Sequence, residues 1–342
     1  MSLRRAVLFP VLIVVVLAAA YGGYWAYAAG LLRSGVDDWI ATQRAAGVEV
    51  RYGALAVGGF PLSLDISADD VVAAGTAGYL AWEARTAALD VRAAPWDLQR
   101  LTFETGDAPM LRLVNIASGE RADITAATAT GNAAFDPRGA LQAGKLNLQK
   151  AAAEGTGPLM PLIARALTAE YGPGSAGAAE VAVRAIEIGL PPHPAARLGD
   201  VMQSLTATLI VHGAIPAAPT APALAVWRDN GGRVEVRFLE AVWGPVAVSA
   251  SGEVGLDADL QPIGKLSTST RGYREVVSAA EEAGQLTAER AAQLRLLLEV
   301  MATRPADGGA PRLDADLRVA NRRLSAGIIP LAELPHLRWR AE

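Results

Sequence analysis

Residues 51–71, RYGALAVGGFPLSLDISADDV, carry the most particular pattern in the chain. Two short runs of alternating apolar residues, 52–57 and 62–66, lie on either side of a turn motif. The glycines of the motif permit positive φ, and its proline fixes φ and removes a backbone donor. The stretch predicts a strand, a tight turn and a second strand, with the phenylalanine closing the end of the core; an exposed docking loop is the alternative. The motif consists of Gly58, Gly59, Phe60 and Pro61.

The composition excludes several classes of protein. The chain has 342 residues, 51% of them hydrophobic, which is enough for one large β-rich domain or two smaller ones. The net charge is −4, and there is no long basic run, so nucleic acid is a poor candidate partner. The chain has no cysteine, which excludes disulfides, thiol catalysis and cysteine-based zinc sites.

The amino-terminal segment predicts a membrane anchor. Residues 6–32 contain no charged side chain, and about 20 apolar residues are enough to span a bilayer as a helix. Arg4 and Arg5 precede the segment, and aromatic residues gather at its far end. These features predict a single-pass inner-membrane protein with a cytoplasmic amino terminus and a periplasmic bulk. A signal peptide cleaved after residue 20 or 28 is the alternative, which the length of the apolar run disfavours.

Beyond residue 47 most of the chain shows the period of half-buried strands. Apolar and polar residues alternate, and turn signals rich in Gly, Pro, Asp and Asn separate the runs. The pattern predicts an α+β fold after the anchor, dominated by a mostly antiparallel, curved sheet with a few packing helices. The clearest strand runs are 62–66, 80–82, 87–91, 111–113, 146–148, 181–183, 186–188, 205–211, 234–238, 246–248 and 313–319.

Besides the anchor, five helices are predicted. A helix capped by Ser34 is expected to end near Ala46, and proline-led helices are expected over 158–171 and 194–205. A helical hairpin is expected over 273–302, with Gly284 ending its first helix and Thr287 capping its second. The apolar face of the second helix is predicted to pack on the sheet; a membrane surface is the alternative. That face comprises Leu294, Leu297, Leu298 and Met301.

Three segments follow from these patterns. Residues 1–32 form the cytoplasmic tip and anchor. Residues 33–214 form a first β-rich part and residues 224–342 a second, which contains the hairpin. The proline- and alanine-rich stretch 215–223 separates the two parts, because its prolines disfavour regular pairing.

Short motifs in a fixed order support a family resemblance. They are Arg51-Tyr52-Gly53, Gly59-Phe60-Pro61, Trp82, Ala94-Pro95-Trp96, Trp243-Gly244-Pro245, Ser251-Gly252, Gly264 and the ending 324–337. In this order they resemble the DUF2125 family of uncharacterised alphaproteobacterial envelope proteins. The resemblance implies a membrane-anchored exported protein and supplies no activity and no functional residues. A distant similarity to AsmA-like proteins implies a curved sheet that shelters lipid, by analogy of fold alone.

Candidate catalytic and metal-binding residues are few. His193, His212 and His336 are far apart in sequence, and nothing near them supplies a second ligand or an orienting group. We therefore interpret them as ordinary surface or loop residues, and we expect no catalytic site, no metal and no cofactor.

Three further patterns have ordinary explanations. Residues 139–145, GALQAGK, resemble a phosphate-binding loop but lack the following Ser or Thr, and GPGSAG at 172–177 follows a predicted helix. Both are interpreted as chance in a glycine-rich chain. The sequence LDADL occurs at 256–260 and 313–317, where alternation places each pair of carboxylates on one strand face. Calcium binding and a solvated strand face are the two interpretations, and the second is favoured.

The sequence favours a non-enzymatic function. If the predicted sheet curls, its inner side becomes an apolar groove, and the protein binds or passes a lipid or another apolar ligand there. A structural or interaction protein with an envelope partner is the alternative, and an envelope hydrolase is disfavoured because no nucleophile motif occurs. The residues expected on the groove wall are Leu62, Leu64, Ile66, Trp82, Val236 and Phe238.

Overall fold

The fold was established from a computed structural model. The structure describes residues 3–116, 118–156, 160–191, 198–214, 216, 220–304, 310–326, 329–337 and 339. Within these ranges, the side chains of residues 3–15, 18, 77, 176 and 329–332 are left undescribed.

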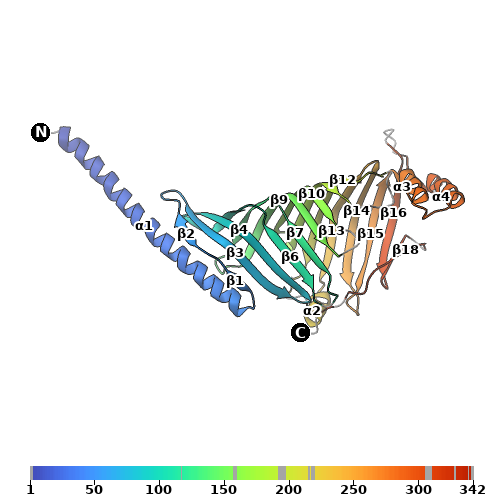
Figure 1. The fold of residues 1–342 in the computed structure, drawn as a ribbon, viewed down its shortest axis with the longest axis horizontal. Helices are drawn as coiled ribbons and strands as arrows, with labels where there is room; N and C mark the ends of the chain where they lie inside the picture. Colours follow the sequence, from blue (N-terminus) through green and yellow to red (C-terminus); the bar gives the residue numbers. More distant parts are fainter. Residues whose placement is uncertain are drawn as a thin grey trace.

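The described residues form an α+β fold in which antiparallel strands predominate, as the alternation predicted (Figure 1). The helices are α1 (Leu3–Ala45), α2 (Ala221–Asp229), α3 (Tyr273–Glu282), α4 (Ala288–Met301) and a 3-10 turn, η1 (Ser175–Gly177). The strands of the first half are β1 (Glu49–Arg51), β2 (Leu55–Gly58), β3 (Leu64–Ala77), β4 (Leu80–Ala94), β5 (Asp97–Thr105), β6 (Met110–Asn115), β7 (Arg121–Thr125), β8 (Thr128–Phe135) and β9 (Leu141–Gly155). Those of the second half are β10 (Leu162–Pro173), β11 (Ala179–Gly189), β12 (Val201–His212), β13 (Arg233–Trp243), β14 (Val246–Leu256), β15 (Pro262–Arg271), β16 (Arg312–Ala320), β17 (Arg323–Ala326) and β18 (Ile329–Glu333).

The sheet is one long meander in which neighbours in sequence pair side by side. From β9 to β18 each strand pairs antiparallel with the next. In the first half, short strands share a long neighbour: β1 and β2 both pair with β3, β5 and β6 with β4, and β7 and β8 with β9. Each of these pairs of short strands therefore acts as one interrupted strand.

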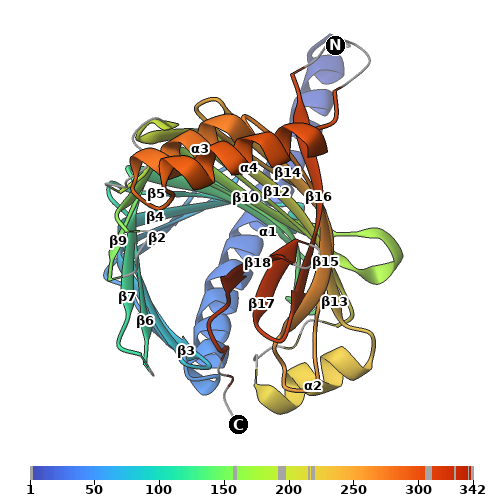
Figure 2. The ribbon, with the colours of Figure 1, turned by 90° about the vertical axis from the view of Figure 1, so that its right-hand side faces the viewer.

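Irregular residues lie in a line across the sheet from β3 to β12, where the sheet bends. Asp70, Lys150 and Glu187 have positive φ, and the breaks between β5 and β6 and between β7 and β8 fall on the same line. An extra or irregular residue bends a strand and increases its twist. Viewed along the sheet, the strands form an arch, with α1 inside its outline at one end and α3 and α4 across the other (Figure 2).

Helix α1 is one continuous helix, which corrects the prediction of a separate helix beginning at Ser34. The Ser34 hydroxyl donates to the carbonyl oxygen of Leu31 within the helix and caps nothing. The amino-terminal half of α1 stands away from the sheet (Figure 1). The predicted anchor 6–32 lies only partly within the described side chains. Over the residues that the structure describes, no helix combines the length and the apolar character needed to cross a membrane.

Two predicted helices are wrong. Residues 162–171 of the segment predicted as helix 158–171 belong to β10, and residues 201–205 of the segment predicted as helix 194–205 belong to β12. The remaining residues of these segments include 158–159 and 194–197, which lie outside the described part. The apolar residues of these segments fit either period, and pairing with strands on both sides decides for the sheet.

The predicted division at 215–223 does not interrupt the sheet. Strands β12 and β13, on either side of it, pair directly from His212 with Arg233 to Met202 with Trp243. Helix α2 begins inside the stretch at Ala221, with the Thr220 side chain accepting from the Ala223 amide. Residues 215 and 217–219 lie outside the described part.

The helical hairpin is confirmed, and the predicted packing of its second helix is confirmed only in part. Gly284 has positive φ after α3, and the Thr287 hydroxyl accepts from the Arg290 amide at the start of α4. Ala279 of α3 packs against Val246 of β14. Of the predicted face of α4, Leu294 and Leu298 are half-buried and Leu297 and Met301 are exposed, because α4 contacts the sheet mainly at β16 while α3 lies against β14.

Candidate functional site

The two faces of the sheet differ in chemistry, and two adjacent rows of directly paired residues show this. Directly opposite residues of an antiparallel pair project from the same face. One row is apolar apart from its threonine: Ile66, Val91, Phe103, Gly131, Leu146, Ala169, Val183, Ala207, Leu239, Ala250, Thr268 and Ala315. The next row, one residue along each strand, is mostly polar: Asp65, Arg92, Thr102, Asn132, Lys145, Glu170, Ala182, Thr208 and Phe238.

The apolar face is the inner side of the arch. Ala129, Ala151 and Ala164 on this face are buried, although no helix lies on them. Side chains on the inside of a bend crowd one another, which accounts for their burial. Helix α1 also packs on this side, because it contacts β1, where Val50 is buried, and α3 packs on Val246 of the same face. We call this side the inner face.

No second layer covers the middle of the inner face among the elements that the structure describes. Apart from isolated contacts, strands touch only their hydrogen-bonded neighbours, and helices touch the sheet only at β1, β14 and β16. The accessible surface is 20933 Å², whereas a compact monomer of 35.5 kDa exposes about 13,000 Å². The protruding half of α1 and the single-layer sheet both contribute to this excess.

Aromatic side chains fix α1 at the first end of the arch. The Trp25 indole donates to the Ser63 carbonyl oxygen at 2.8 Å, and the Tyr24 hydroxyl donates to that of Pro95 at 2.9 Å. The Phe60 ring meets Trp25 edge-on with the ring centroids 5.4 Å apart, and the Tyr21 hydroxyl donates to the Pro61 carbonyl oxygen. The turn of the sequence motif is thus the point where α1 meets the sheet.

Gly59 is required in this turn. It has φ of +95°, and a Cβ built there lies 2.8 Å from the Ser63 carbonyl oxygen. The predicted burial of Phe60 is wrong, because this side chain is 58% exposed. The turn closes on itself through backbone contacts and does not need the ring as a plug.

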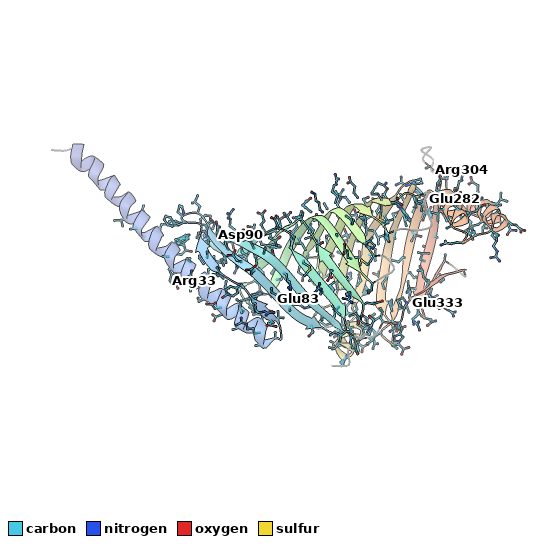
Figure 3. All side chains as sticks on the ribbon, in the orientation of Figure 1. Arg33, Glu83, Asp90, Glu282, Arg304 and Glu333 are labelled. Atoms are coloured by element: carbon cyan, nitrogen blue, oxygen red, sulfur yellow. The ribbon has the colours of Figure 1, made fainter. Side chains whose placement is uncertain are left out.

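Ion pairs and hydroxyls cover the outer face. The Arg92 guanidinium donates to Asp65 at 2.8 Å and lowers the pKa of that carboxyl, and Arg112 does the same for Asp123 at 2.7 Å. Side chains stand out from this side of the sheet, with Asp90 among them (Figure 3). Such exposed pairs contribute little to stability, so their main effect is to keep this face hydrated.

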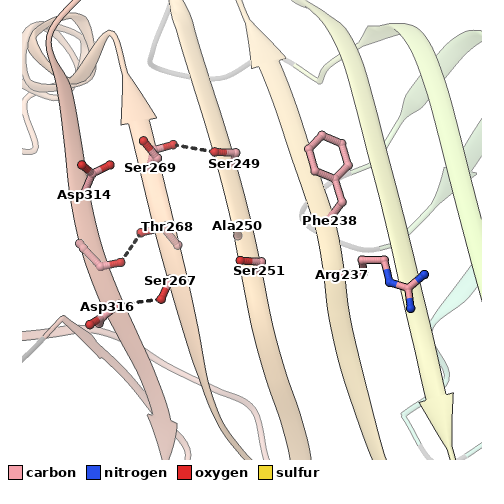
Figure 4. A pocket seen from close by; sticks show the side chains of 11 residues that line it. Arg237, Phe238, Ser249, Ala250, Ser251, Ser267, Thr268, Ser269, Asp314 and Asp316 are labelled. Carbon is pink, nitrogen blue, oxygen red and sulfur yellow. Dashed lines mark hydrogen bonds between the residues drawn. The ribbon is translucent and has the colours of Figure 1, made fainter. Parts of the chain in front are cut away.

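A shallow depression of about 530 Å³ lies on the outer face over β13 to β16 (Figure 4). The Ser267 hydroxyl donates to Asp316 at 2.8 Å, and the Thr268 hydroxyl donates to the Ala315 carbonyl oxygen at 2.8 Å. Hydrogen bonding from Ser269 lowers the pKa of Asp314. The residues that line the depression include no histidine, and the hydroxyls of Ser249, Ser267 and Ser269 already have acceptors. It therefore resembles a hydrated surface more than a reaction site.

The remaining polar candidates lie apart from one another. His212 pairs with Glu235 at 3.1 Å, which lowers the pKa of that carboxyl, and His336 is exposed near the carboxyl terminus. His193 lies outside the described residues. Asp257 lies in the turn after β14, where its carboxylate accepts from the Asp259 and Gln261 amides. Within the described residues no three His, Asp or Glu side chains are grouped to hold a metal ion.

The structure separates the six residues predicted for the groove wall. Ile66 and Val236 lie on the inner face, and Trp82 joins them beside Gly75. Leu64 is on the same side, but Leu64 at 0% and Ile66 at 8% exposure are both buried, so neither side chain is open to a ligand as it stands. Leu62 is exposed in the turn. Phe238 belongs to the outer row, because one extra residue in β13 between Val236 and Leu239 reverses the alternation there.

The sequence did not reveal the middle of the inner face. The short apolar runs 146–148, 181–183 and 205–211 were predicted as strands, but their register was not. Pairing places Leu146, Val183 and Ala207 in one row, and no signal within a single strand specifies such an alignment. The regular recurrence of alanine among these runs is the only hint that their side chains crowd on a bend.

The chain belongs to the DUF2125 family, described as an uncharacterized protein conserved in bacteria, whose model matches residues 25–335. The match confirms the resemblance predicted from the short motifs. No curated protein matches the chain, and no solved structure matches it.

Proposed function

We propose that this protein is a membrane-anchored protein of the cell envelope that binds or passes a lipid, or another ligand with an apolar chain, along the inner face of its sheet. The observation that supports this proposal is an apolar row that continues from Ile66 to Ala315 without a covering layer. Apolar surface left in water is unfavourable by about 25 cal/mol per Å². An acyl chain laid on this face removes that surface from water, at about 0.8 kcal/mol for each buried methylene.

The dimensions of the face suit a long ligand. The apolar row crosses twelve strand positions, and neighbouring strands lie about 4.8 Å apart, so the row is about 50 Å long. The charged outer face suits an aqueous compartment, and the uncharged segment 6–32 remains the predicted anchor. Arg4 and Arg5 before it support a cytoplasmic amino terminus and a periplasmic sheet. The distant similarity to AsmA-like proteins remains a prediction.

The test is native mass spectrometry with lipid extraction on the full chain in mild detergent. The full chain is needed because Tyr21, Tyr24 and Trp25 hold the first turn of the sheet. A bound lipid in fixed stoichiometry is the expected result. A clean apo mass, with no uptake of added phospholipid, would contradict the proposal.

Adjacent residues of β12 supply a matched pair of variants. Leu209 pairs with Val236 on the inner face, and Thr208 pairs with Phe238 on the outer face. Leu209→Glu places a carboxylate under the acyl chain and should lose the bound lipid, whereas Thr208→Glu should keep it. Leu209→Ser is a milder change that replaces Leu209→Glu if the latter does not fold. Circular dichroism checks the fold of each variant. Equal lipid in all three would place the lipid elsewhere, for example around the anchor.

An interaction protein is the second candidate, and one surface favours it. Helix α4 exposes Leu296 at 72% and Val300 at 86%, beside exposed Leu297 and Met301. A protein partner docked here would bury them. A partner that is cross-linked to α4 in cells and lost in Val300→Glu, combined with an apo mass for the full chain, would favour this function over lipid carriage.

A further inference from the structure

An uncharged collar surrounds the point where α1 leaves the sheet. Two turns of the sheet meet the helix there, 59–63 before β3 and 95–96 between β4 and β5. Three aromatic side chains of α1 donate hydrogen bonds to backbone carbonyl oxygens of these turns. We define the collar as Tyr21, Tyr24, Trp25, Phe60, Leu62 and Trp96.

The collar exposes large apolar side chains at its tips. Leu62 is 71% exposed and Trp96 is 67% exposed. Their turns are held in place, because Tyr24 bonds to Pro95 and Trp25 bonds to Ser63. The exposed side chains therefore project from an ordered platform.

Charge is absent from the collar and begins at its border. Residues 53–64, 93–96 and 6–32 contain no Asp, Glu, Lys or Arg. The charges that border these segments on the sheet include Asp65 and Arg92, which pair with each other at 2.8 Å, and Asp97, which pairs with Arg100. Neutral aromatic and aliphatic side chains ringed by charge are typical of protein surfaces that lie in the interfacial layer of a bilayer.

The length of the uncharged part of α1 also indicates that the collar contacts a bilayer. From Ala6 to Trp25 there are 20 residues, which span about 30 Å as a helix and match the hydrocarbon thickness of a bilayer. The collar aromatics at 21–25 then fall at the far interface. We propose that the collar rests in the interfacial layer of the membrane that holds α1, with Phe60, Leu62 and Trp96 inserted among the lipid headgroups. This inference rests on the proposed membrane anchor and extends it to the sheet.

This position of the collar in the interfacial layer fixes the orientation of the molecule. The β3–β4 end of the arch lies at the bilayer, and α3 and α4 lie about 50 Å away along the sheet. The inner face then begins at the membrane surface and leads away from it. A lipid on that face has a path from the bilayer toward the α4 end.

The test uses single cysteines, since the chain has none of its own. A polarity-sensitive fluorophore is attached at Leu62→Cys, Trp96→Cys, Val14→Cys or Val300→Cys in the full chain, reconstituted in phosphatidylcholine nanodiscs. Lipids with a quencher near the headgroup or deep in the acyl chain report depth. Leu62 and Val300 are matched, since both are highly exposed apolar residues, at opposite ends of the arch.

We expect blue-shifted emission at positions 62 and 96 that headgroup quenchers reduce, and water-like emission at position 300 that they do not. Quenching at position 14 by deep quenchers shows that the anchor is in the bilayer. If position 14 is quenched and positions 62 and 96 are not, the collar proposal is wrong and the anchor stands. A blue shift at positions 62 and 96 without lipid quenching would mean a protein contact and would also overturn it. No quenching at position 14 would remove the anchor and the collar together.

Discussion

Helices lie at both ends of the arch, but different forces hold them. At the first end, neutral aromatic side chains of α1 bond to backbone carbonyls and pack on Phe60. At the other end, α3 packs on Val246, and carboxylates of α3 and α4 pair with arginines. Glu299 alone accepts from Arg274, Arg304 and Tyr273.

This difference indicates how each end responds to its surroundings. Neutral hydrogen bonds and ring packing do not depend on pH or salt in the ordinary range, and they tolerate the low dielectric near a bilayer. Exposed ion pairs weaken with salt and with protonation of the carboxylate. The first end is therefore suited to a membrane surface and the second to water.

The largest effect is expected at the second end from Ala279→Asp. Ala279 is buried against Val246 and Leu198, so the variant leaves an unpaired charge without water. We expect a loss of about 3 kcal/mol or more in the free energy that holds the hairpin to the sheet. Hydrogen exchange of α3 measures it. Val276→Asp, at an exposed position of the same helix, is the control, and equal exchange in the two variants would mean that α3 does not pack as described.

The corresponding change at the first end is Trp25→Ala. It removes the edge-on contact with Phe60 and the hydrogen bond to Ser63. Because the indole is half-buried, we expect a loss of about 2 kcal/mol in the free energy that holds α1 to this turn. Protease cleavage in the turn 59–63 should increase, as measured by mass spectrometry of the fragments. Tyr27→Ala, at an exposed position of α1, should leave cleavage unchanged. An unchanged rate in Trp25→Ala would show that α1 is not fixed there.

Acid should loosen the contact between α3 and α4 at the second end. Hydrogen bonds from Arg274 and then Arg304 lower the pKa of Glu299 from its ordinary value of 4.5 to about 2. Because the folded pKa lies below the unfolded one, this stabilisation is complete above about 4.5 and is lost as the pH falls toward 2. Distances between spin labels at Gln293→Cys and Arg318→Cys should broaden over this range. Glu299→Gln should show the broad distance distribution already at neutral pH. If Glu299→Gln instead keeps the narrow distribution at neutral pH and broadens only at low pH, as the unmodified chain does, another group is responsible for the effect.

The smallest effect is expected from Tyr24→Phe. The variant keeps the ring and removes the donor to the Pro95 carbonyl oxygen. We expect the free energy of unfolding to fall by about 1 kcal/mol. Denaturant unfolding of the full chain in detergent measures it, with Tyr27→Phe as the control. A loss as large as that of Trp25→Ala would show that the hydrogen bond, and not the ring packing, holds the helix.

Local patterns were enough for much of the fold and little of the candidate site. The turn at Gly59, the caps at Gly284 and Thr287, and the alternating strands all depend on residues close in sequence, and the structure confirms them. Strand β10 and the first residues of β12 were missed, because proline-led apolar runs there also fit a helix, whereas residues 205–211 of β12 were predicted as a strand. Phe238 was assigned to the wrong face because an extra residue in β13 is defined only by its neighbours.

The sequence by itself determined that the chain forms a mostly antiparallel sheet with one apolar face, since composition and period-two alternation are local properties. Only the tertiary structure decided that this face runs unbroken from Ile66 to Ala315, because register depends on pairing between strands. The tertiary structure likewise decided the bend of the arch, which follows from irregular residues that align across neighbouring strands. It also placed α1 against the turn at Gly59, since the aromatic donors and their carbonyl acceptors are about 40 to 70 residues apart.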